Sequence, residues 1–347
     1  MPRTTGFLTL TDNSGIGIYL TFQIEDRNEM KRLLALSLLT VASVVKGQNS
    51  STDQKAPVIE SSKSWMDIDY AGDGIVGHKL DIYLPKNGQG PFPIVVAIYG
   101  SAWFSNSSKN TVFNDGLGQA LLNNGFAVVT INHRSSADAK FPAQIHDVKA
   151  ALRFTRANAA RFSLDSNFMG ITGFSSGGHL SSLAASTSGI TSITVAGEMV
   201  DLEGQVGKYP GSDSRVDAVV DWFGPTDFLI MDSCGSSFSH NDAKSPESSL
   251  IGGPIQEHPL KVIQANPISY INESCPHFLI IHGDQDPLVP LCESQKLFAR
   301  LQKDKVQSEL IVVPGGKHGP GVMIGPYYDK MVSFFKKELA SVRKASK

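Results

Sequence analysis

A glycine-flanked serine constrains the fold of this chain more than any other feature of its sequence. Ser175 lies in the run GFSSGG, after the apolar stretch 168–171 and before a stretch typical of a helix, 179–185. A G-x-S-x-G turn between a strand and a helix needs small residues around the serine, because a Cβ there would collide with neighbouring backbone. The pattern predicts an α/β arrangement that raises the Ser175 hydroxyl above a sheet edge as a nucleophile. Alternatively, Ser175 only caps the following helix.

A nucleophilic serine of this kind needs an acid and then a histidine later in the chain. The apolar run 276–283 predicts a buried strand, and the loop after it carries two carboxylates, Asp284 and Asp286. We favour Asp286, because Asp284 directly follows the Gly283 turn, where an Asx side chain commonly caps its own loop. Asp227 stays open as a third alternative.

The histidine partner follows by elimination. His318 is the only one of the nine histidines that lies after the favoured acid. A strand predicted at 309–313 ends shortly before it, so His318 falls on a loop at the carboxyl end of a strand, where open α/β sheets place their sites. We therefore predict that His318 is the general base. His146, His179 and His282 are expected to pack or cap.

Donors for an oxyanion are expected beside the nucleophile. The backbone N–H of Ser176 supplies one of them. An apolar strand predicted at 93–98 is followed by Tyr-Gly-Ser-Ala-Trp, and here Ser101 and Ala102 offer main-chain N–H groups without side-chain crowding. Trp103, next to this loop, is predicted to form a wall of the substrate pocket.

Composition excludes several other kinds of protein. The net charge is -2 and 18% of residues are charged, which gives no bias toward nucleic acid or membrane. The chain lacks H-E-x-x-H, paired C-x-x-C and G-x-x-x-x-G-K motifs, so we expect neither a metal nor a cofactor.

Of the three cysteines, Cys234, Cys275 and Cys292, at least one must be unpaired. We favour buried free thiols, although one disulfide stays possible in a secreted protein.

Strand-like and helix-like stretches alternate along the chain, which indicates a mostly parallel sheet with helical crossovers. Two loop-rich segments, 187–214 and 231–271, are expected to form a cap over the pocket. The expected elements are antiparallel edge strands at 67–70 and 79–84, core strands at 125–131 and 216–220, helices at 143–157 and 331–339, and pocket or core aromatic residues Tyr209, Trp222, Phe223 and Phe238.

Taken together, these motifs resemble the α/β-hydrolase superfamily, specifically the hormone-sensitive-lipase-like esterases and the Bacteroidetes-type feruloyl and acetylxylan esterases. Further landmarks are the helix at 141–153, Phe-Gly-Pro-Thr-Asp at 223–227 and His-Gly-x-x-Asp-x-x-Val-Pro at 282–290. Tyr99 and Ser101 depart from the family's usual His-Gly-Gly-Gly/Ala-Trp loop. The resemblance implies an α/β-hydrolase fold, a mostly parallel central sheet flanked by helices with cap insertions. It assigns Ser175 as nucleophile, Asp286 as acid, His318 as base, and Ser101, Ala102 and Ser176 as oxyanion-hole donors.

The amino terminus predicts secretion. Met30-Lys31-Arg32 precedes an apolar run, 33–45, that is too short to span a membrane comfortably, and a polar stretch follows. The expected organisation is an upstream or non-native extension at 1–29, a signal peptide at 30–47, a polar tether at 48–64 and a single α/β-hydrolase domain at 65–341. The protein is then secreted or periplasmic, with no integral membrane segment when mature. The alternative is a cytosolic protein with an internal helix at 33–45.

The resemblance also implies a function. We expect a serine carboxylic-ester hydrolase that acts through an acyl-enzyme on plant cell-wall polysaccharide esters, feruloyl or acetyl, with acylated xylan or its oligosaccharides as substrate. Three alternatives remain open: a general short-chain carboxylesterase, a serine peptidase of the prolyl-oligopeptidase type, and a non-catalytic hydrolase fold used for binding.

Overall fold

The computed structural model describes residues 4–11, 17–24, 57–195 and 197–345. The chain divides into two units between Ala56 and Pro57. In the first unit, strands β1 (Thr4–Thr11) and β2 (Gly17–Ile24) pair antiparallel within the predicted extension at 1–29. The signal peptide predicted at 30–47 lies outside the described residues, as does the tether up to residue 56.

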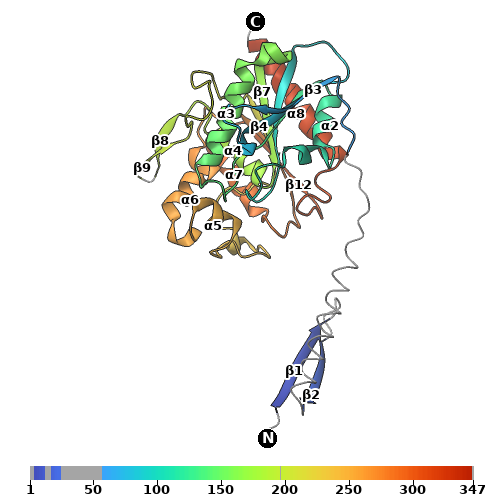
Figure 1. Ribbon diagram of the computed structural model, residues 1–347, viewed down its shortest axis with the longest axis vertical. Coiled ribbons are helices and arrows are strands. Elements are labelled where there is room, and N and C mark those ends of the chain that lie inside the picture. The colour runs from blue at the N-terminus through green and yellow to red at the C-terminus, as the bar shows by residue number, and fades with distance from the viewer. Residues whose placement is uncertain (1–3, 12–16, 25–56, 196, 346–347) are drawn as a thin grey trace. The chain divides into compact units, whose positions relative to one another are not determined.

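An eight-stranded sheet forms the centre of the second unit (Figure 1), in the order β12-β11-β10-β7-β5-β6-β4-β3. The pairs β3–β4 and β4–β6 are antiparallel and the others are parallel. The predicted edge position is correct for β3 and wrong for β4, which lies between β3 and β6. The strands are β3 (Lys63–Asp69), β4 (Lys79–Leu84), β5 (Phe92–Ile98), β6 (Ala127–Ile131), β7 (Leu164–Phe174), β10 (Ala218–Trp222), β11 (His277–Gly283) and β12 (Ser308–Val313), with a separate hairpin of β8 (Ser192–Val195) and β9 (Glu198–Asp201).

Helices cover both faces of this sheet. Helices α3, α4 and α7 pack on one face, and α2 and α8 on the other. The α-helices are α2 (Leu117–Asn123), α3 (Ala143–Ala157), α4 (Ser176–Ser186), α5 (Pro246–Ile251), α6 (Pro259–Ala265), α7 (Cys292–Lys303) and α8 (Gly325–Ala345). Short 3-10 helices are η1 (Val76–His78), η2 (Lys109–Phe113), η3 (Ala159–Phe162), η4 (Asp232–Cys234), η5 (Ile255–Glu257) and η6 (Pro267–Tyr270).

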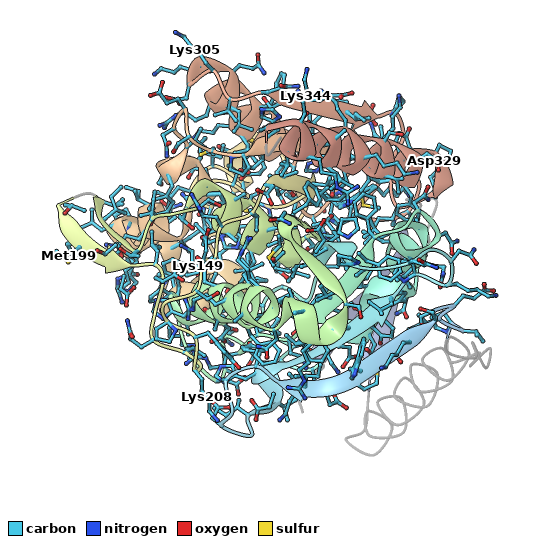
Figure 2. All side chains as sticks on the ribbon, turned by 90° about the horizontal axis from the view of Figure 1, so that it is seen from above. Lys149, Met199, Lys208, Lys305, Asp329 and Lys344 are labelled. Carbon is cyan, nitrogen blue, oxygen red and sulfur yellow. A yellow bond between two sulfur atoms is a disulfide. The ribbon has the colours of Figure 1, made fainter. Side chains whose placement is uncertain are left out.

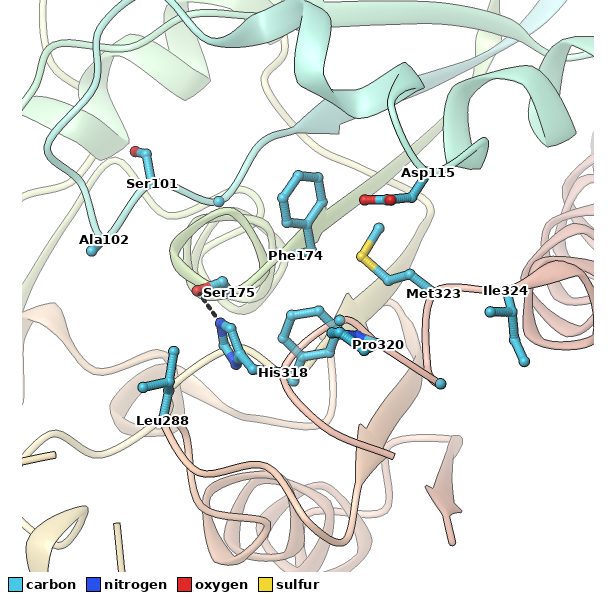
Figure 3. A pocket seen from close by; sticks show the side chains of 14 residues that line it. Ser101, Ala102, Asp115, Phe174, Ser175, Leu288, His318, Pro320, Met323 and Ile324 are labelled. Carbon is cyan, nitrogen blue, oxygen red and sulfur yellow. Dashed lines mark hydrogen bonds between the residues drawn. The ribbon is translucent and has the colours of Figure 1, made fainter. Parts of the chain in front are cut away.

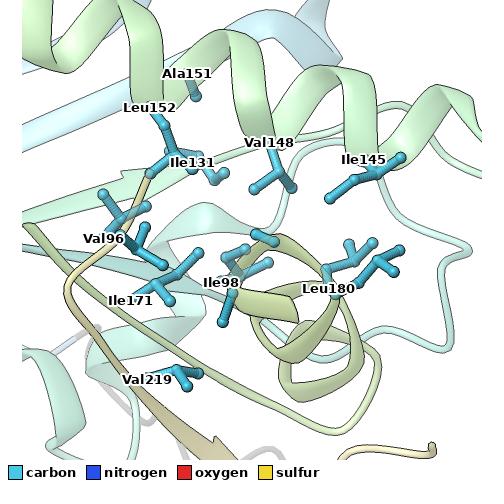
Figure 4. Close-up of a cluster of buried hydrophobic side chains, with 14 of the residues drawn as sticks. Val96, Ile98, Ile131, Ile145, Val148, Ala151, Leu152, Ile171, Leu180 and Val219 are labelled. Carbon is cyan, nitrogen blue, oxygen red and sulfur yellow. The ribbon is translucent and has the colours of Figure 1, made fainter. Parts of the chain in front are cut away.

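The alternation of side chains along β5 explains this layering. Every residue of β5 is buried, because successive side chains point to opposite faces and each face is covered by helices. Val96 and Ile98 belong to the core beneath α3 and α4, where they meet Val148 and Leu180 (Figure 4). Their neighbours Val95 and Ala97 belong to the core beneath α2 and α8. A strand that is apolar on both faces must lie in the middle of the sheet, which brings its carboxyl end to the site.

The segment 187–214 does not cap the site, which corrects our expectation. It packs along α3, where the buried Lys149 ammonium donates hydrogen bonds to the carbonyl groups of Thr187 (2.9 Å) and Ile190 (2.8 Å). Figure 2 shows Lys149 inside the body of the protein, in contrast to Lys208 at its margin. A buried ammonium must be paired, so these bonds hold the segment against α3 and away from Ser175.

Two of the three cysteines form a disulfide, which also corrects our expectation of free thiols. Cys234, at the end of η4, is bonded to Cys292, the first residue of α7, and their Cα atoms are 6.3 Å apart. Cys275 is a buried free cysteine, as expected. The bond links the segment after β10 to the helix that follows the predicted acid loop.

Candidate active site

Ser175 occupies the sharp turn between β7 and α4. Its backbone dihedrals are φ 57° and ψ -125°, a conformation that residues with a side chain rarely adopt. A Cβ on Gly173 would lie 2.3 Å from the Gly177 oxygen, and one on Gly177 would lie 2.2 Å from the Ile98 oxygen. The turn therefore requires glycine at both positions, and the predicted strand, turn and helix are all present.

The three residues predicted to act together lie in one hydrogen-bonded row. His318 Nε2 is 2.9 Å from Ser175 Oγ (Figure 3), and His318 Nδ1 is 2.7 Å from Asp286 Oδ2. Each residue follows the carboxyl end of a parallel strand: β7 for Ser175, β11 for Asp286 and β12 for His318. Parallel strands end on the same edge of the sheet, which is why positions far apart in sequence meet.

The Asp286 carboxylate is buried and is held by hydrogen bonds and by two histidines. Its Oδ1 accepts hydrogen bonds from the backbone N–H groups of Leu288 (2.9 Å) and Val289 (3.0 Å). His282 Nε2 lies 3.4 Å from its Oδ2. Burial alone would raise the pKa of Asp286, but the hydrogen bonds and charges of His282 and His318 outweigh burial and hold the pKa below its usual value. Asp286 is therefore ionised at neutral pH.

The two competing carboxylates have other partners. Asp284 Oδ1 accepts a hydrogen bond from the Gly315 N–H at 2.7 Å, so it caps the loop after β12. Asp227 forms an ion pair with Lys296 and accepts a hydrogen bond from the side chain of Asn266. Neither carboxylate contacts His318 in the described part of the chain.

Of the three predicted oxyanion donors, one is already bonded within the protein. The Ser101 N–H donates a hydrogen bond to Ser176 Oγ at 2.9 Å, so it is already used, and its predicted role as a free donor is corrected. Ser176 is the first residue of α4, so its N–H has no acceptor within the helix. Ala102 adopts a left-handed conformation (φ 51°) and lines the site. Ala102 and Ser176 remain as candidate donors.

A large cavity lies on one side of Ser175. Its volume is about 680 Å³, and its lining includes Phe174, Phe223, the loop after His318 and the exposed Asp115 (Figure 3). The ring of Phe223 packs against the His318 ring at a centroid distance of 4.7 Å. Several lining residues, among them Asp115, Leu288 and Ile324, are exposed, so the cavity is open toward solvent.

A smaller cavity of about 190 Å³ also borders Ser175. Its lining residues are Ala102, Trp103, Ser175, Ser176, Pro225, Phe238, His240, Pro246, Glu247, Leu288, Val289 and His318. Trp103 thus lies where we predicted a pocket wall. The segment 231–271 contributes Phe238, His240, Pro246 and Glu247, so this half of the expected cap does reach the site. Tyr209 and Trp222 line neither cavity and pack in the core instead.

Glu293 holds the loop that carries Phe223. Its buried Oε2 accepts hydrogen bonds from the backbone N–H groups of Thr226 and Asp227, both at 2.6 Å. Burial raises the pKa of the Glu293 carboxyl from 4.5 to about 7, although the two N–H groups favour the charged form. This acid therefore changes its protonation near neutral pH.

Glu293→Gln is expected to flatten the pH dependence of stability. Between pH 4.5 and about 7 the folded protein binds a proton that the unfolded chain has released, so stability falls as the pH rises through this window. The loss is about 3 kcal/mol at most. Glutamine keeps an oxygen acceptor but does not titrate. Denaturant unfolding of both proteins at several pH values tests this, and parallel curves from pH 5 to 8 would contradict it.

Three residues lie near Ser175 or Asp286 without having been predicted there, although His282 is buried and bonds to Ser294 and the Val289 carbonyl, in keeping with its expected packing role. His282 contacts Asp286, and the four-residue spacing in His-Gly-x-x-Asp was a signal for that contact. His240 and Glu247 line the smaller cavity, and their surrounding sequence, rich in serine and glycine, has no motif that marks them. His146 and His179 make packing or backbone contacts, as expected.

In the residues that the structure describes, no group of three or more His, Cys, Asp or Glu side chains is arranged to hold a metal ion. None of the helices in this part of the chain is long and apolar enough to cross a membrane.

Two solved structures share both the fold and much of the sequence. A truncated form of a carbohydrate esterase from gut microbiota is 46% identical, with a TM-score of 0.78, over 82% of this chain and 99% of that one. A bifunctional GH43-CE protein of Bacteroides eggerthii is 52% identical, with a TM-score of 0.75, over 79% of this chain and 38% of that one.

Curated relatives and a family match extend this likeness. Esterase LipC of Mycobacterium tuberculosis is 29% identical over 245 residues, which are 68% of this chain and 55% of LipC. The probable carboxylic ester hydrolase LipM of the same organism is 30% identical over 68% of this chain and 51% of LipM. The chain spans about half the length of these curated relatives. Residues 80–301, more than half of the chain, match the BD-FAE family, and so the chain belongs to this family of α/β-hydrolase esterases.

Proposed function

We propose that this chain is a carboxylic ester hydrolase that acts on esters carried by carbohydrate. Ser175 is its nucleophile, His318 its general base and Asp286 its orienting acid. One observation carries the proposal: a serine hydroxyl, an imidazole and a buried carboxylate are linked at 2.9 Å and 2.7 Å beside a cavity. Such a row is what activation of a serine requires. The likeness to a carbohydrate esterase along 99% of that chain supports the substrate class.

The reaction proceeds in two halves. In the first, His318 Nε2 removes the Ser175 proton while Oγ bonds to the ester carbonyl carbon, and the N–H groups of Ala102 and Ser176 stabilise the oxyanion. His318 then returns the proton to the alcohol oxygen as the bond between carbon and that oxygen breaks. In the second half a water, deprotonated by His318, attacks the acyl-enzyme, and the acid is released from Ser175.

The charge of Asp286 supports both halves of this reaction. His318 gains a positive charge each time it takes a proton, and a buried carboxylate 2.7 Å from Nδ1 stabilises that charge. The same contact keeps the proton of the neutral ring on Nδ1, which leaves Nε2 free to accept the serine proton. The backbone donors on Oδ1 hold the carboxylate in this orientation.

Within this class, the proposed substrate is a feruloyl or acetyl ester on plant cell-wall polysaccharide, and acylated xylan is the polysaccharide we favour. The open cavity of about 680 Å³ suits a sugar chain that extends beyond the site. Action on a polysaccharide requires export, which fits the signal peptide predicted at 30–47. An amino-terminal sequence of the mature protein that starts upstream of residue 30 would contradict export by this segment.

Hydrolysis of a substrate panel tests the function. The purified protein is incubated with acetylated xylan, methyl ferulate, p-nitrophenyl acetate and a proline-containing peptide. We expect acid to be released from acetylated xylan, from methyl ferulate or from both. If every ester stays intact, the proposal is wrong. Hydrolysis of p-nitrophenyl acetate alone would indicate a general short-chain carboxylesterase, and peptide cleavage would indicate a peptidase.

A further inference from the structure

Three buried polar atoms in the lining of the smaller cavity have no hydrogen-bond partner among the described residues. They are Trp103 Nε1, His240 Nδ1 and Glu247 Oε2. Buried polar atoms are nearly always bonded, because leaving one unpaired costs free energy. His240 Nδ1 and Glu247 Oε2 lie 3.0 Å apart and face each other, which leaves Trp103 Nε1 as the atom without a protein partner. A carboxylate can accept several hydrogen bonds, so a molecule bound in this cavity could satisfy Trp103 and also bond to Glu247.

Glu247 is the acceptor in this group. Its carboxylate is almost fully buried, and Oε2 lies 3.0 Å from His240 Nδ1. His240 is fixed from its other side, where Nε2 contacts the Leu288 oxygen at 2.9 Å and Ser236 Oγ at 3.0 Å. Burial alone would lower the pKa of His240, but Glu247 outweighs burial and raises it. Glu247 therefore contacts His240 and, as a carboxylate with several acceptor sites, can also accept a hydrogen bond from a bound molecule.

The rest of the lining is mostly apolar. Trp103, Pro225, Phe238 and Val289 surround a space of about 190 Å³, equal to about six water molecules. Such a space holds a compact acyl group and is too small for a polysaccharide, which instead lies in the open cavity. An acyl group that fits has an apolar body and a hydroxyl that reaches Glu247.

We propose that the smaller cavity binds the acyl group and that Glu247, positioned by His240, accepts a hydrogen bond from a hydroxyl on that group. Esters of hydroxycinnamic acids have this chemistry, and acetyl esters do not. The inference rests on the proposed ester hydrolysis at Ser175. It makes Glu247 a specificity-determining residue that acts on the ring substituent and not on the reacting carbonyl.

Glu247→Leu tests the proposal with methyl 4-hydroxycinnamate, methyl cinnamate and p-nitrophenyl acetate. We expect kcat/KM for the hydroxylated ester to fall about 10- to 100-fold, mainly through KM, because a hydrogen bond to a charged acceptor is lost. Rates on the other two esters should change less than about twofold, since neither reaches Glu247 with a hydroxyl. Glu257→Leu makes the same change at an exposed position and serves as the matched control. Glu247→Gln, which keeps an oxygen but loses the charge, should give an intermediate loss and replaces the leucine variant if that variant does not fold.

Two outcomes would overturn the inference. An equal loss on methyl cinnamate and methyl 4-hydroxycinnamate would mean that Glu247 supports the cavity wall without contacting a hydroxyl. An equal loss on acetylated xylo-oligosaccharides, with p-nitrophenyl acetate unaffected, would mean that the cavity holds sugar. Failure of the proposed function looks different, because the wild-type protein would then hydrolyse none of these esters.

Discussion

Ser175→Ala is expected to lower kcat for ester hydrolysis by about 10⁶-fold, with little change in KM. The substitution removes the oxygen that lies 2.9 Å from His318 Nε2, so no acyl-enzyme can form. Residual hydrolysis by water would depend on the oxyanion donors and on substrate binding, which this change leaves in place. Pre-steady-state measurement with excess p-nitrophenyl acetate checks the loss of acylation, because the burst of p-nitrophenol should disappear, and steady-state rates check kcat and KM.

Ser176→Ala is the matched control for this prediction. Ser176 is the next serine in the chain, but its Oγ accepts the Ser101 N–H and does not contact His318. Its loss should loosen the loop after β5 and cost about tenfold, the effect of one ordinary hydrogen bond. Equal losses in the two variants would contradict the assignment of Ser175 as nucleophile.

Asp286→Asn is expected to lower kcat by about 10⁴-fold while the fold is retained. The N–H groups of Leu288 and Val289 need an oxygen at the Oδ1 position, so the asparagine amide nitrogen would face His318. A donor there cannot accept the Nδ1 proton, and the ring would shift its proton to Nε2. An imidazole protonated at Nε2 cannot remove the Ser175 proton.

Asp284→Asn separates this effect from a general loss of charge in the loop. Asp284 is exposed and bonds only to the Gly315 N–H among the described residues, and an asparagine oxygen can accept that bond as well. We expect its activity to stay within about twofold of wild type. The thermal unfolding of both variants gives the stability comparison. If Asp284→Asn lost as much activity as Asp286→Asn, the choice of acid would be wrong.

Much of the fold could be predicted because its signals are local. The β5 strand is apolar on both faces, and the glycines around Ser175 exclude other turn geometries. The edge position of β4 was wrong, because its neighbour β6 comes from a later part of the chain and no short-range pattern encodes that pairing. Tyr99, which departs from the family's usual loop, has a buried ring that stacks on His133 and lines neither cavity.

By itself, the sequence predicted the turn at Ser175 and the central sheet, because both depend on residue types at short spacing. It singled out Asp286 and His318 only by their order after Ser175. Only the tertiary structure decided the Cys234–Cys292 bond, the use of the Ser101 N–H and the meeting of His240 with Glu247 at the smaller cavity. These contacts depend on how separate loops pack and on where single N–H groups and side chains point. Residue spacing in the sequence contains no information on loop packing or on the direction of these groups. The lining of the two cavities could therefore be described only from the tertiary structure.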